Sequence, residues 1–397
     1  MCRSARVKAL AVLLASPFAW TGLLLAANNF GEQDRADAAK QMIVLAVQQG
    51  ISSLPPTSSQ SFSYEYDPQK DTYVRSLFLG PTVLRSPQTI GARHLSLRLA
   101  ASYFELSDSF GPTNYLVNSP AAQGLQTKFG LDASAQVGLL NLAAGYGVAN
   151  RFEIDANLPL VLVRAKASEV FVTSPNPNFP DIPIARLPDV LAANLHDGTL
   201  AYRKRTFAQL GADFPDGTHT GVGRISIGGK ALAYAGQRLR VALAPEFFCP
   251  SPSQDALAGS DSAAILPSVI AGLSVADWFR VYVDAGYDYD FTYDELRSFV
   301  WTAGTSIASA QASVDFGLGG SEFNQGIKWT PSTASFPSGT LSALDRNRLG
   351  TSFIDFLFGI KMRVAEKTVL SGAVNTAVNN EGFRAAAIGT LALEVYL

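Results

Sequence analysis

The chain has 397 residues, of which 47% are hydrophobic and 16% charged, and its formal net charge is -2. This balance lacks the strongly basic surface expected of a nucleic-acid-binding protein, so we expect no nucleic-acid partner. A mildly hydrophobic chain with few charges instead favours export or association with a membrane.

The first 27 residues have the pattern of a secretory signal peptide. Arg3, Arg6 and Lys8 precede an apolar run over 9–27, and we expect cleavage near Ala27; an uncleaved anchor is the alternative. Cys2 lies within this segment, so the exported chain keeps a single cysteine and cannot form an intrachain disulfide.

Residues 28–92 are predicted to form an N-terminal periplasmic or plug segment. A helix is expected over 32–50, where acidic residues come early and Gly50 supplies the stop. A Pro- and Ser-rich linker over 55–61 follows, and then 62–66 and 72–75 predict a small hairpin. The segment could serve as a periplasmic helix, a barrel plug or a tether.

Residues 93–397 read as strands that alternate in polarity. In the stretch 279–291 the odd-numbered residues are apolar, whereas most even-numbered ones are polar or charged. Beyond the signal, no clean apolar run reaches the roughly 20 residues that a spanning helix needs. A secreted two-sheet sandwich and a closed membrane barrel both remain compatible with this pattern.

The connection lengths favour the barrel. About twelve strands are predicted, joined alternately by short turns and long loops, which is the arrangement of exported single-chain barrels. The predicted strands span 94–106, 132–145, 152–167, 221–234, 239–248, 263–273, 279–291, 298–307, 310–318, 351–364, 368–376 and 383–397. The fold class is therefore all-β, a transmembrane antiparallel β-barrel with both termini on the short-turn, periplasmic side. The loops 170–220 and 319–350 are expected to be functional, and the first to line or constrict the pore.

Charged side chains recur on one face of these strands. Facing lipid, each Arg or Lys near the midplane would cost roughly 2–4 kcal/mol, so we expect the whole set to line the lumen. Two roles are open: ladders of ion pairs that brace the barrel, or a charge-lined conduit for polar or amphipathic solutes. The candidate lumen-lining residues are Arg98, Glu153, Asp155, Arg224, Lys230, Arg240, Arg280, Asp284, Asp288, Asp355, Lys361, Arg363, Arg384 and Glu394. Aromatic residues near strand ends, Tyr282 and Tyr396 among them, are expected in interface girdles.

Catalytic and metal sites are weakly supported. His94 and Ser96 are two residues apart, the spacing of a base and a nucleophile in a membrane phospholipase barrel, but both are expected to face away from lipid. His196 and His219 fall in loops without a neighbouring cysteine or histidine, so we expect no bound metal and no cofactor.

Four stretches carry a resemblance to a known family. These are Phe62–Pro68, Leu79–Arg93 with the alternating strand behind it, Tyr146–Ile154 and Gly221–Ala231. The pattern resembles the bacterial outer-membrane family labelled meta-pathway of phenol degradation. The resemblance implies an outer-membrane channel of a Gram-negative bacterium for passive uptake of small solutes, hydrophobic or aromatic ones among them. It would be a non-enzyme whose partners are outer-membrane lipid, the barrel-assembly machinery and a solute that the sequence does not identify. A membrane-embedded lipid hydrolase and a structural or adhesive surface barrel are the alternatives.

Overall fold

The structure is a computed structural model. It describes residues 61–67, 72–76, 78–116, 126–174, 201–206, 217–251, 257, 259, 262–324, 334–336, 339–341, 352–379 and 384–397, together with Ile43, Val44, Val47 and Ile51. The predicted signal over 1–27 and most of the two predicted long loops lie outside these residues. Of the predicted helix over 32–50, the three described residues are helical. No helix in the described ranges is both long and apolar enough to cross a membrane.

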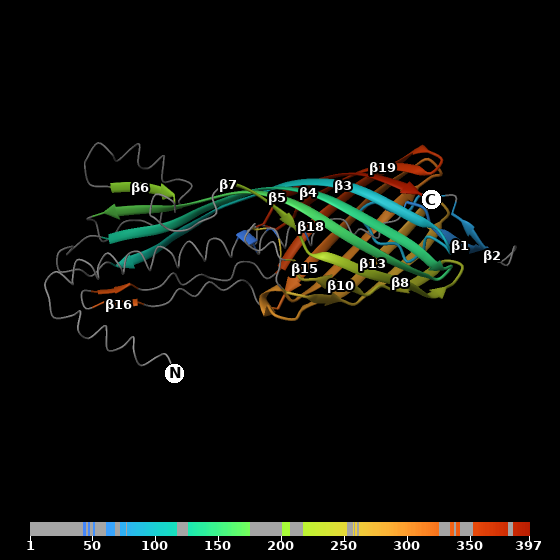
Figure 1. The fold of residues 1–397 in the computed structure, drawn as a ribbon, viewed down its shortest axis with the longest axis horizontal. Coiled ribbons are helices and arrows are strands. Elements are labelled where there is room, and N and C mark those ends of the chain that lie inside the picture. The colour runs from blue at the N-terminus through green and yellow to red at the C-terminus, as the bar shows by residue number, and fades with distance from the viewer. Residues whose placement is uncertain are drawn as a thin grey trace.

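A closed antiparallel β-barrel of twelve strands forms the body of the molecule (Figure 1). Nine of its wall strands are continuous: β3 (Leu95–Leu116), β4 (Gln126–Ala149), β5 (Phe152–Ser174), β13 (Phe279–Asp290), β14 (Ser298–Ala308), β15 (Ala312–Phe323), β18 (Ser352–Ala365), β19 (Thr368–Ala377) and β20 (Ala387–Tyr396). The other three are each built from two pieces: β7 (Gly217–Val222) with β8 (Ile225–Ala235), β9 (Leu239–Leu243) with β10 (Glu246–Cys249), and β11 (Ala264–Leu266) with β12 (Ser268–Ala276). The last strand, β20, pairs with β3 and closes the ring.

Proline accounts for two of the three interrupted strands. Pro245 separates β9 from β10, and Pro267 separates β11 from β12, because proline has no N–H to give to the ladder. Their carbonyl oxygens still accept backbone hydrogen bonds from the flanking strands, from Gly229 at 3.0 Å and from Tyr287 at 3.2 Å. The wall is therefore notched but continuous around its circumference.

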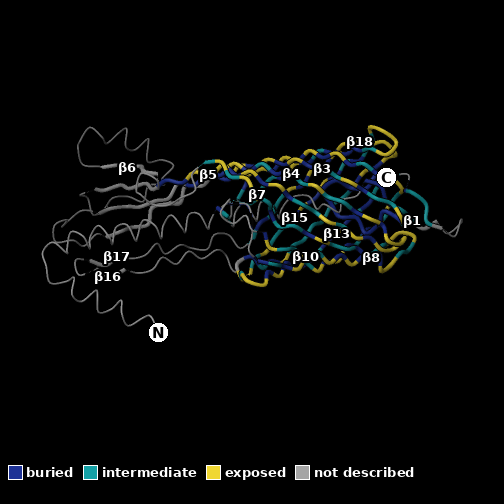
Figure 2. Tube along the Cα trace, viewed as in Figure 1, coloured by how far each residue is buried: buried dark blue, intermediate teal, exposed yellow. Residues whose placement is uncertain are grey.

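Alternation along the strands sorts side chains to two faces, as predicted. Val283 is 48% exposed on the outer surface, whereas its neighbour Asp284 is 9% exposed and faces inward. Figure 2 shows the same alternation of buried and exposed positions along most of the wall. The outer face carries the large apolar side chains that a lipid environment requires.

Three adjacent strands are much longer than the others. β3, β4 and β5 have 22, 24 and 23 residues, whereas β13, β14 and β15 have 12, 11 and 12. At the usual rise per residue, ten extra residues add about 30 Å. In Figure 1 this three-stranded sheet continues beyond the rest of the barrel, where β6 (Ala201–Thr206) pairs with β5.

The opposite end of the barrel holds the segment before the first wall strand. β1 (Tyr64–Asp67) and β2 (Thr72–Arg75) form the predicted hairpin. The following residues 78–92, which we call the plug, adopt an irregular path in contact with inward-facing side chains. Both the plug and the chain end at Leu397 lie at this end of the barrel, the plugged end.

Candidate functional site: the plugged lumen and its apolar collar

The plug is fixed to one side of the wall by a buried ion pair. Lys230 Nζ of β8 lies 2.8 Å from Glu153 Oε1 of β5, and the two side chains are 1% and 0% exposed. Lys230 also donates to the carbonyl oxygen of Ser86 at 3.1 Å, and Glu153 accepts from the backbone N–H of Ile90 at 2.8 Å. The pair thus satisfies plug backbone groups that would otherwise be buried without partners.

Other strands hold the plug in the same way. Lys361 Nζ of β18 donates to the carbonyl oxygen of Pro81 at 2.8 Å, and the carboxylate of Asp315 on β15 accepts from the N–H of Thr82. Arg85 donates to Ser268 Oγ at 2.7 Å and lies 3.4 Å from Asp284 Oδ2.

Close backbone approach completes the fit. A Cβ added at Gly147 of β4 would lie 1.7 Å from the carbonyl oxygen of Gly91, and Gly91 itself has a φ of +80°. Arg93, with a φ of 64°, donates its N–H to the carbonyl oxygen of Gly147 at 2.6 Å. A side chain at position 147 would push this end of the plug away from β4.

The remaining predicted lumen-lining residues lie near the same end or higher along the wall. Arg240 and Arg280 both pair with Glu65 of β1, at 3.2 and 2.8 Å. Glu394 accepts from the N–H of Ser61 at 3.1 Å, and Arg98 is its cross-strand partner. The guanidinium of Arg363 lies 5.1 Å from the ring centroid of Phe62.

The other candidates contact wall residues rather than the hairpin. Arg224 lies 3.8 Å from Asp288, Arg384 pairs with Asp355, and Asp155 is beside Gly228.

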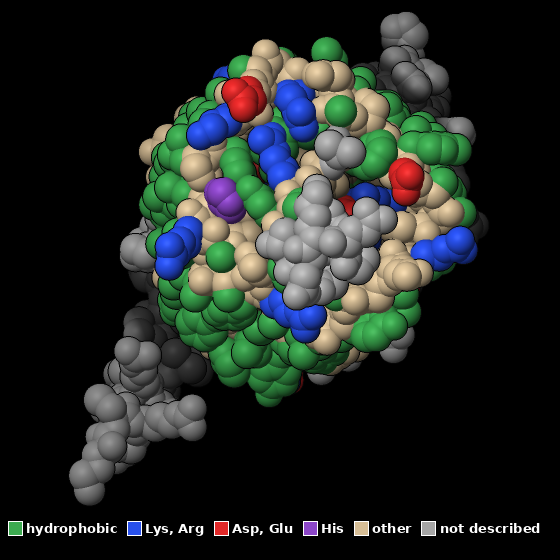
Figure 3. Space-filling view, turned by 90° about the vertical axis from the view of Figure 1, so that its right-hand side faces the viewer, with side chains coloured by type: hydrophobic (Ala, Val, Ile, Leu, Met, Phe, Trp, Pro, Cys, Tyr) green, Lys and Arg blue, Asp and Glu red, His purple; other side chains and the backbone are tan. Residues whose placement is uncertain are grey.

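The sequence pattern predicts none of these plug contacts. Ion pairs between inward charges, one of the two predicted roles, are present, but six of the fourteen candidates also contact plug or hairpin residues: Glu153, Lys230, Asp284, Lys361, Arg240 and Arg280. Asp315, an anchor, was not among the candidates, although its position in an alternating strand could have identified it. Tyr282 and Tyr396 were expected in interface girdles, but both are buried against the plug and hairpin. Figure 3 views this end of the barrel, over which Lys and Arg side chains are spread.

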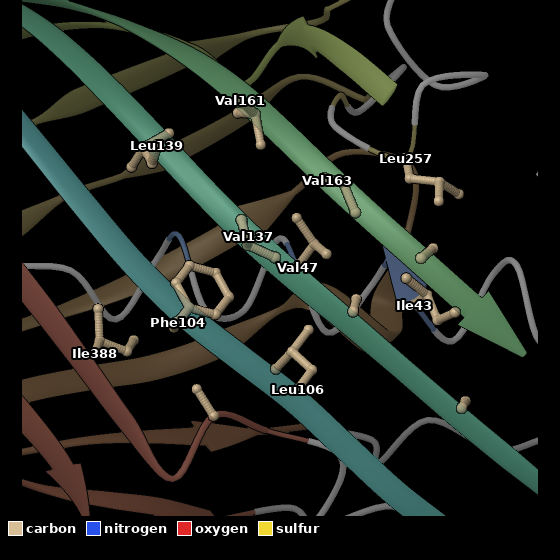
Figure 4. Close-up of a cluster of buried hydrophobic side chains, with 14 of the residues drawn as sticks. Ile43, Val47, Phe104, Leu106, Val137, Leu139, Val161, Val163, Leu257 and Ile388 are labelled. Atoms are coloured by element: carbon tan, nitrogen blue, oxygen red, sulfur yellow. The ribbon is translucent and has the colours of Figure 1, made fainter. Parts of the chain in front are cut away.

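Above the plug, the inner wall of β3, β4 and β5 becomes apolar. Figure 4 shows these side chains gathered on the inner face of the three long strands. We call this surface the apolar collar; it consists of Phe104, Leu106, Val137, Leu139, Val161 and Val163. Ile43 and Val47, both 0% exposed, pack against it.

The outer wall of the same strands becomes polar near the upper edge of the collar. Among the residues of β3 and β5 whose exposure the structure describes, Tyr103 and Leu162 are the last large exposed apolar ones, and the next outward positions are Glu105 and Arg164. Glu105 and Arg164 both pair across the ladder with Gln136, whose Nε2 donates to Glu105 Oε1 at 3.0 Å. Just below this row the sheet is apolar on both faces, because the collar lines its inside; above the row, the described inward positions are Leu106, Ala133, Ala135, Ala165 and Ala167, while Ser134 and Lys166 face outward.

The arrangement of His94 and Ser96 does not support a hydrolase. The His94 ring stacks between Tyr64 and Tyr396, with ring centroids 4.7 and 5.2 Å apart. The Ser96 hydroxyl donates to Glu394 Oε1 at 3.0 Å. Neither side chain bonds the other, so His94 does not activate the hydroxyl in this geometry. Within the described part of the chain, no group of three His, Cys, Asp or Glu residues could hold a metal ion.

Comparison with solved structures finds several outer-membrane channels of low sequence identity. The COG4313 outer membrane channel from Pseudomonas putida F1 is 12% identical, with 78% of this chain and 97% of that chain covered and a TM-score of 0.43. The toluene transporter TbuX from Ralstonia pickettii is 10% identical, with 77% and 89% covered and a TM-score of 0.36. The CymD monoaromatic hydrocarbon channel is 9% identical, with 77% and 89% covered and a TM-score of 0.36.

The family comparison is more informative. A search of curated proteins by sequence gave no match. A family model described as "Putative MetA-pathway of phenol degradation" matches residues 118–336, which is more than half of the chain. That match covers β4 through β15 and the wall strands between them, including the collar positions on β4 and β5. The chain is thus an outer-membrane β-barrel that belongs to the family of this MetA-pathway model.

Proposed function

We propose that this protein is a passive outer-membrane channel through which small apolar or amphipathic solutes, aromatic ones among them, enter a Gram-negative cell. The observation that carries this proposal is the apolar collar on the inner wall of β3, β4 and β5. A pore for ions or sugars has no need of an apolar inner wall at its outer mouth, since water would have to be removed from the solute there. The family's own description, which names phenol degradation, agrees with this class of solute.

The two ends of the barrel support an inward direction of uptake. We place the long-strand end outside the cell, because exported barrels carry their long connections outside and their short turns in the periplasm. The plugged end and the chain end at Leu397 then face the periplasm. Arg164 and Lys166 on β5 would stand in water above the bilayer, and the apolar collar would begin just below them inside the barrel.

The plug argues against a wide pore for ions, because it occupies the plugged end of the lumen. Buried anchors on β5, β8, β13, β15 and β18 hold it from several directions. We therefore expect low ion conductance together with uptake of apolar solutes. Outer-membrane lipid around the exposed apolar belt and the barrel-assembly machinery are the partners that this proposal implies.

Solute uptake tests the proposal directly. Cells of a Gram-negative host that produce the full chain should take up radiolabelled p-xylene faster than cells with an empty vector, while glycerol uptake should not change. Equal p-xylene uptake by the two strains, with the protein shown to be folded by its heat-modifiable gel mobility, would refute it.

A further inference from the structure

Among the described residues, several buried side-chain atoms have no hydrogen-bond partner, and three of them lie together on the inner wall. They are Asn141 Oδ1 on β4, Asn157 Oδ1 on β5 and Ser226 Oγ on β8. Ser226 is 1% exposed, so its hydroxyl is shielded from bulk solvent. Leaving such groups unpaired costs stability, and their presence on one wall indicates an occupant that satisfies them.

The ladder places these three atoms close together. Asn157 and Ser226 are direct cross-strand partners, and such pairs on one face have Cβ atoms about 4.5–5.5 Å apart. Asn141 is the diagonal neighbour of Asn157, because Asn157 pairs with Ala143 and Asn141 lies two residues further along β4. Diagonal neighbours are about 7–8 Å apart, within reach of a shared small ligand.

Along the barrel, these three atoms lie between the Glu153–Lys230 pair that anchors the plug and the apolar collar. Two inward steps toward the plug from Asn157 and Ser226 are Glu153 and Lys230, the pair that binds the plug backbone. One inward step toward the long-strand end from Asn141 is Leu139, which belongs to the apolar collar. A solute lying against the collar would thus have one end at the three polar atoms.

We propose that Asn141, Asn157 and Ser226 form a recognition site for the hydroxyl group of an amphipathic solute whose apolar body lies against the collar. A neutral hydroxyl fits because it can donate to an amide oxygen and accept from Ser226 at the same time. This inference rests on the proposed function and adds to it a preference for hydroxylated solutes over hydrocarbons of the same shape.

An isosteric pair of ligands measures that preference. p-Cresol and p-xylene differ by a hydroxyl in place of a methyl group, and binding of each to the detergent-solubilised full chain can be followed by saturation-transfer NMR. Detergent partitioning is corrected with micelles that contain no protein. We expect p-cresol to bind on the order of tenfold more tightly than p-xylene, because a site built for a hydroxyl leaves its polar groups unpaired with the hydrocarbon.

Variants locate the preference. Asn157→Leu and Ser226→Ala should bring the two affinities to within about twofold, because p-cresol loses its hydrogen bonds and p-xylene no longer leaves polar groups unpaired. Ser102→Ala is the matched control, since it removes an equal volume from an inward hydroxyl that already bonds Thr390 at 2.8 Å. It should keep the preference for p-cresol.

The outcomes separate this inference from the proposed function. If neither ligand binds the wild type, the proposed function fails. If both bind equally, or if Asn157→Leu and Ser226→Ala keep the preference, the hydroxyl site is wrong and the proposed function stands. A rise in thermal stability of these variants without a change in preference would also refute the site, because the atoms would then be structural groups satisfied by water.

Discussion

Removing one member of the Glu153–Lys230 pair should weaken both the barrel and its plug. Both side chains are buried, their charged atoms are 2.8 Å apart, and each also bonds the plug backbone. Lys230→Met leaves the Glu153 carboxylate buried without its cation, and breaking a buried pair in this way costs about 3–5 kcal/mol. Glu153→Gln should have a similar cost, since it leaves the Lys230 ammonium unpaired.

The double variant decides whether the two act together. Glu153→Gln with Lys230→Met removes both charges, and the glutamine oxygen can still accept from the N–H of Ile90. We therefore expect the double variant to lose roughly 1–3 kcal/mol less of its free energy of unfolding than the sum of the losses in the two single variants. The assay is urea unfolding in lipid vesicles, read from the heat-modifiable gel mobility of the folded barrel.

Ion conductance provides a second readout for the plug. Single-channel recordings of Lys230→Met should show more frequent openings than the wild type, because the plug loses its contact at Ser86. Wild-type stability and conductance in both single variants would refute the idea that this pair anchors the plug. Additive losses in the double variant would show that the two side chains act separately.

Three further predictions concern the wall. Val283→Arg should destabilise the folded barrel in vesicles by roughly 2–4 kcal/mol, whereas Val275→Arg, beside the turn after β12, should destabilise it by no more than about 1 kcal/mol. Equal costs would contradict the assigned depth. Gly147→Ala should raise ion conductance by displacing the plug backbone, while Gly138→Ala, with only a 4.0 Å contact, should behave as the wild type, and no difference in current between them would count against the docked plug. A maleimide that cannot cross the outer membrane should label Asp277→Cys only after the cells are permeabilised; labelling of intact cells would invert the topology.

The fold was largely predictable because lipid imposes a strict alternation on a barrel strand. All twelve predicted strands match the structure in position, including the face assigned to Val283 and Asp284. The ends of β3, β4 and β5 were less predictable. Their outward positions become polar at Glu105, Gln136 and Arg164, so a pattern that expects one constant apolar face ends the strand too early.

The contacts of the lumen could not be predicted from alternation alone. Alternation gives a side chain its face but not its partner, and the partners here are backbone atoms of an irregular segment. The carbonyl oxygens of Pro81 and Ser86 have no signature in the sequence that would connect them with Lys361 and Lys230. The unpaired atoms of the proposed hydroxyl site also depend on a register that only the structure provides.

A charge in the apolar collar gives the most direct test of the central claim that apolar solutes pass along this inner wall. Val163→Asp places a carboxylate on the collar, and Lys166→Asp, outward on the same strand above the membrane boundary, is the matched control. The measurement is the initial rate of radiolabelled p-xylene uptake by cells with equal amounts of folded barrel. The account predicts that Val163→Asp lowers this rate at least about tenfold and that Lys166→Asp leaves it unchanged. Wild-type uptake by Val163→Asp would contradict the account.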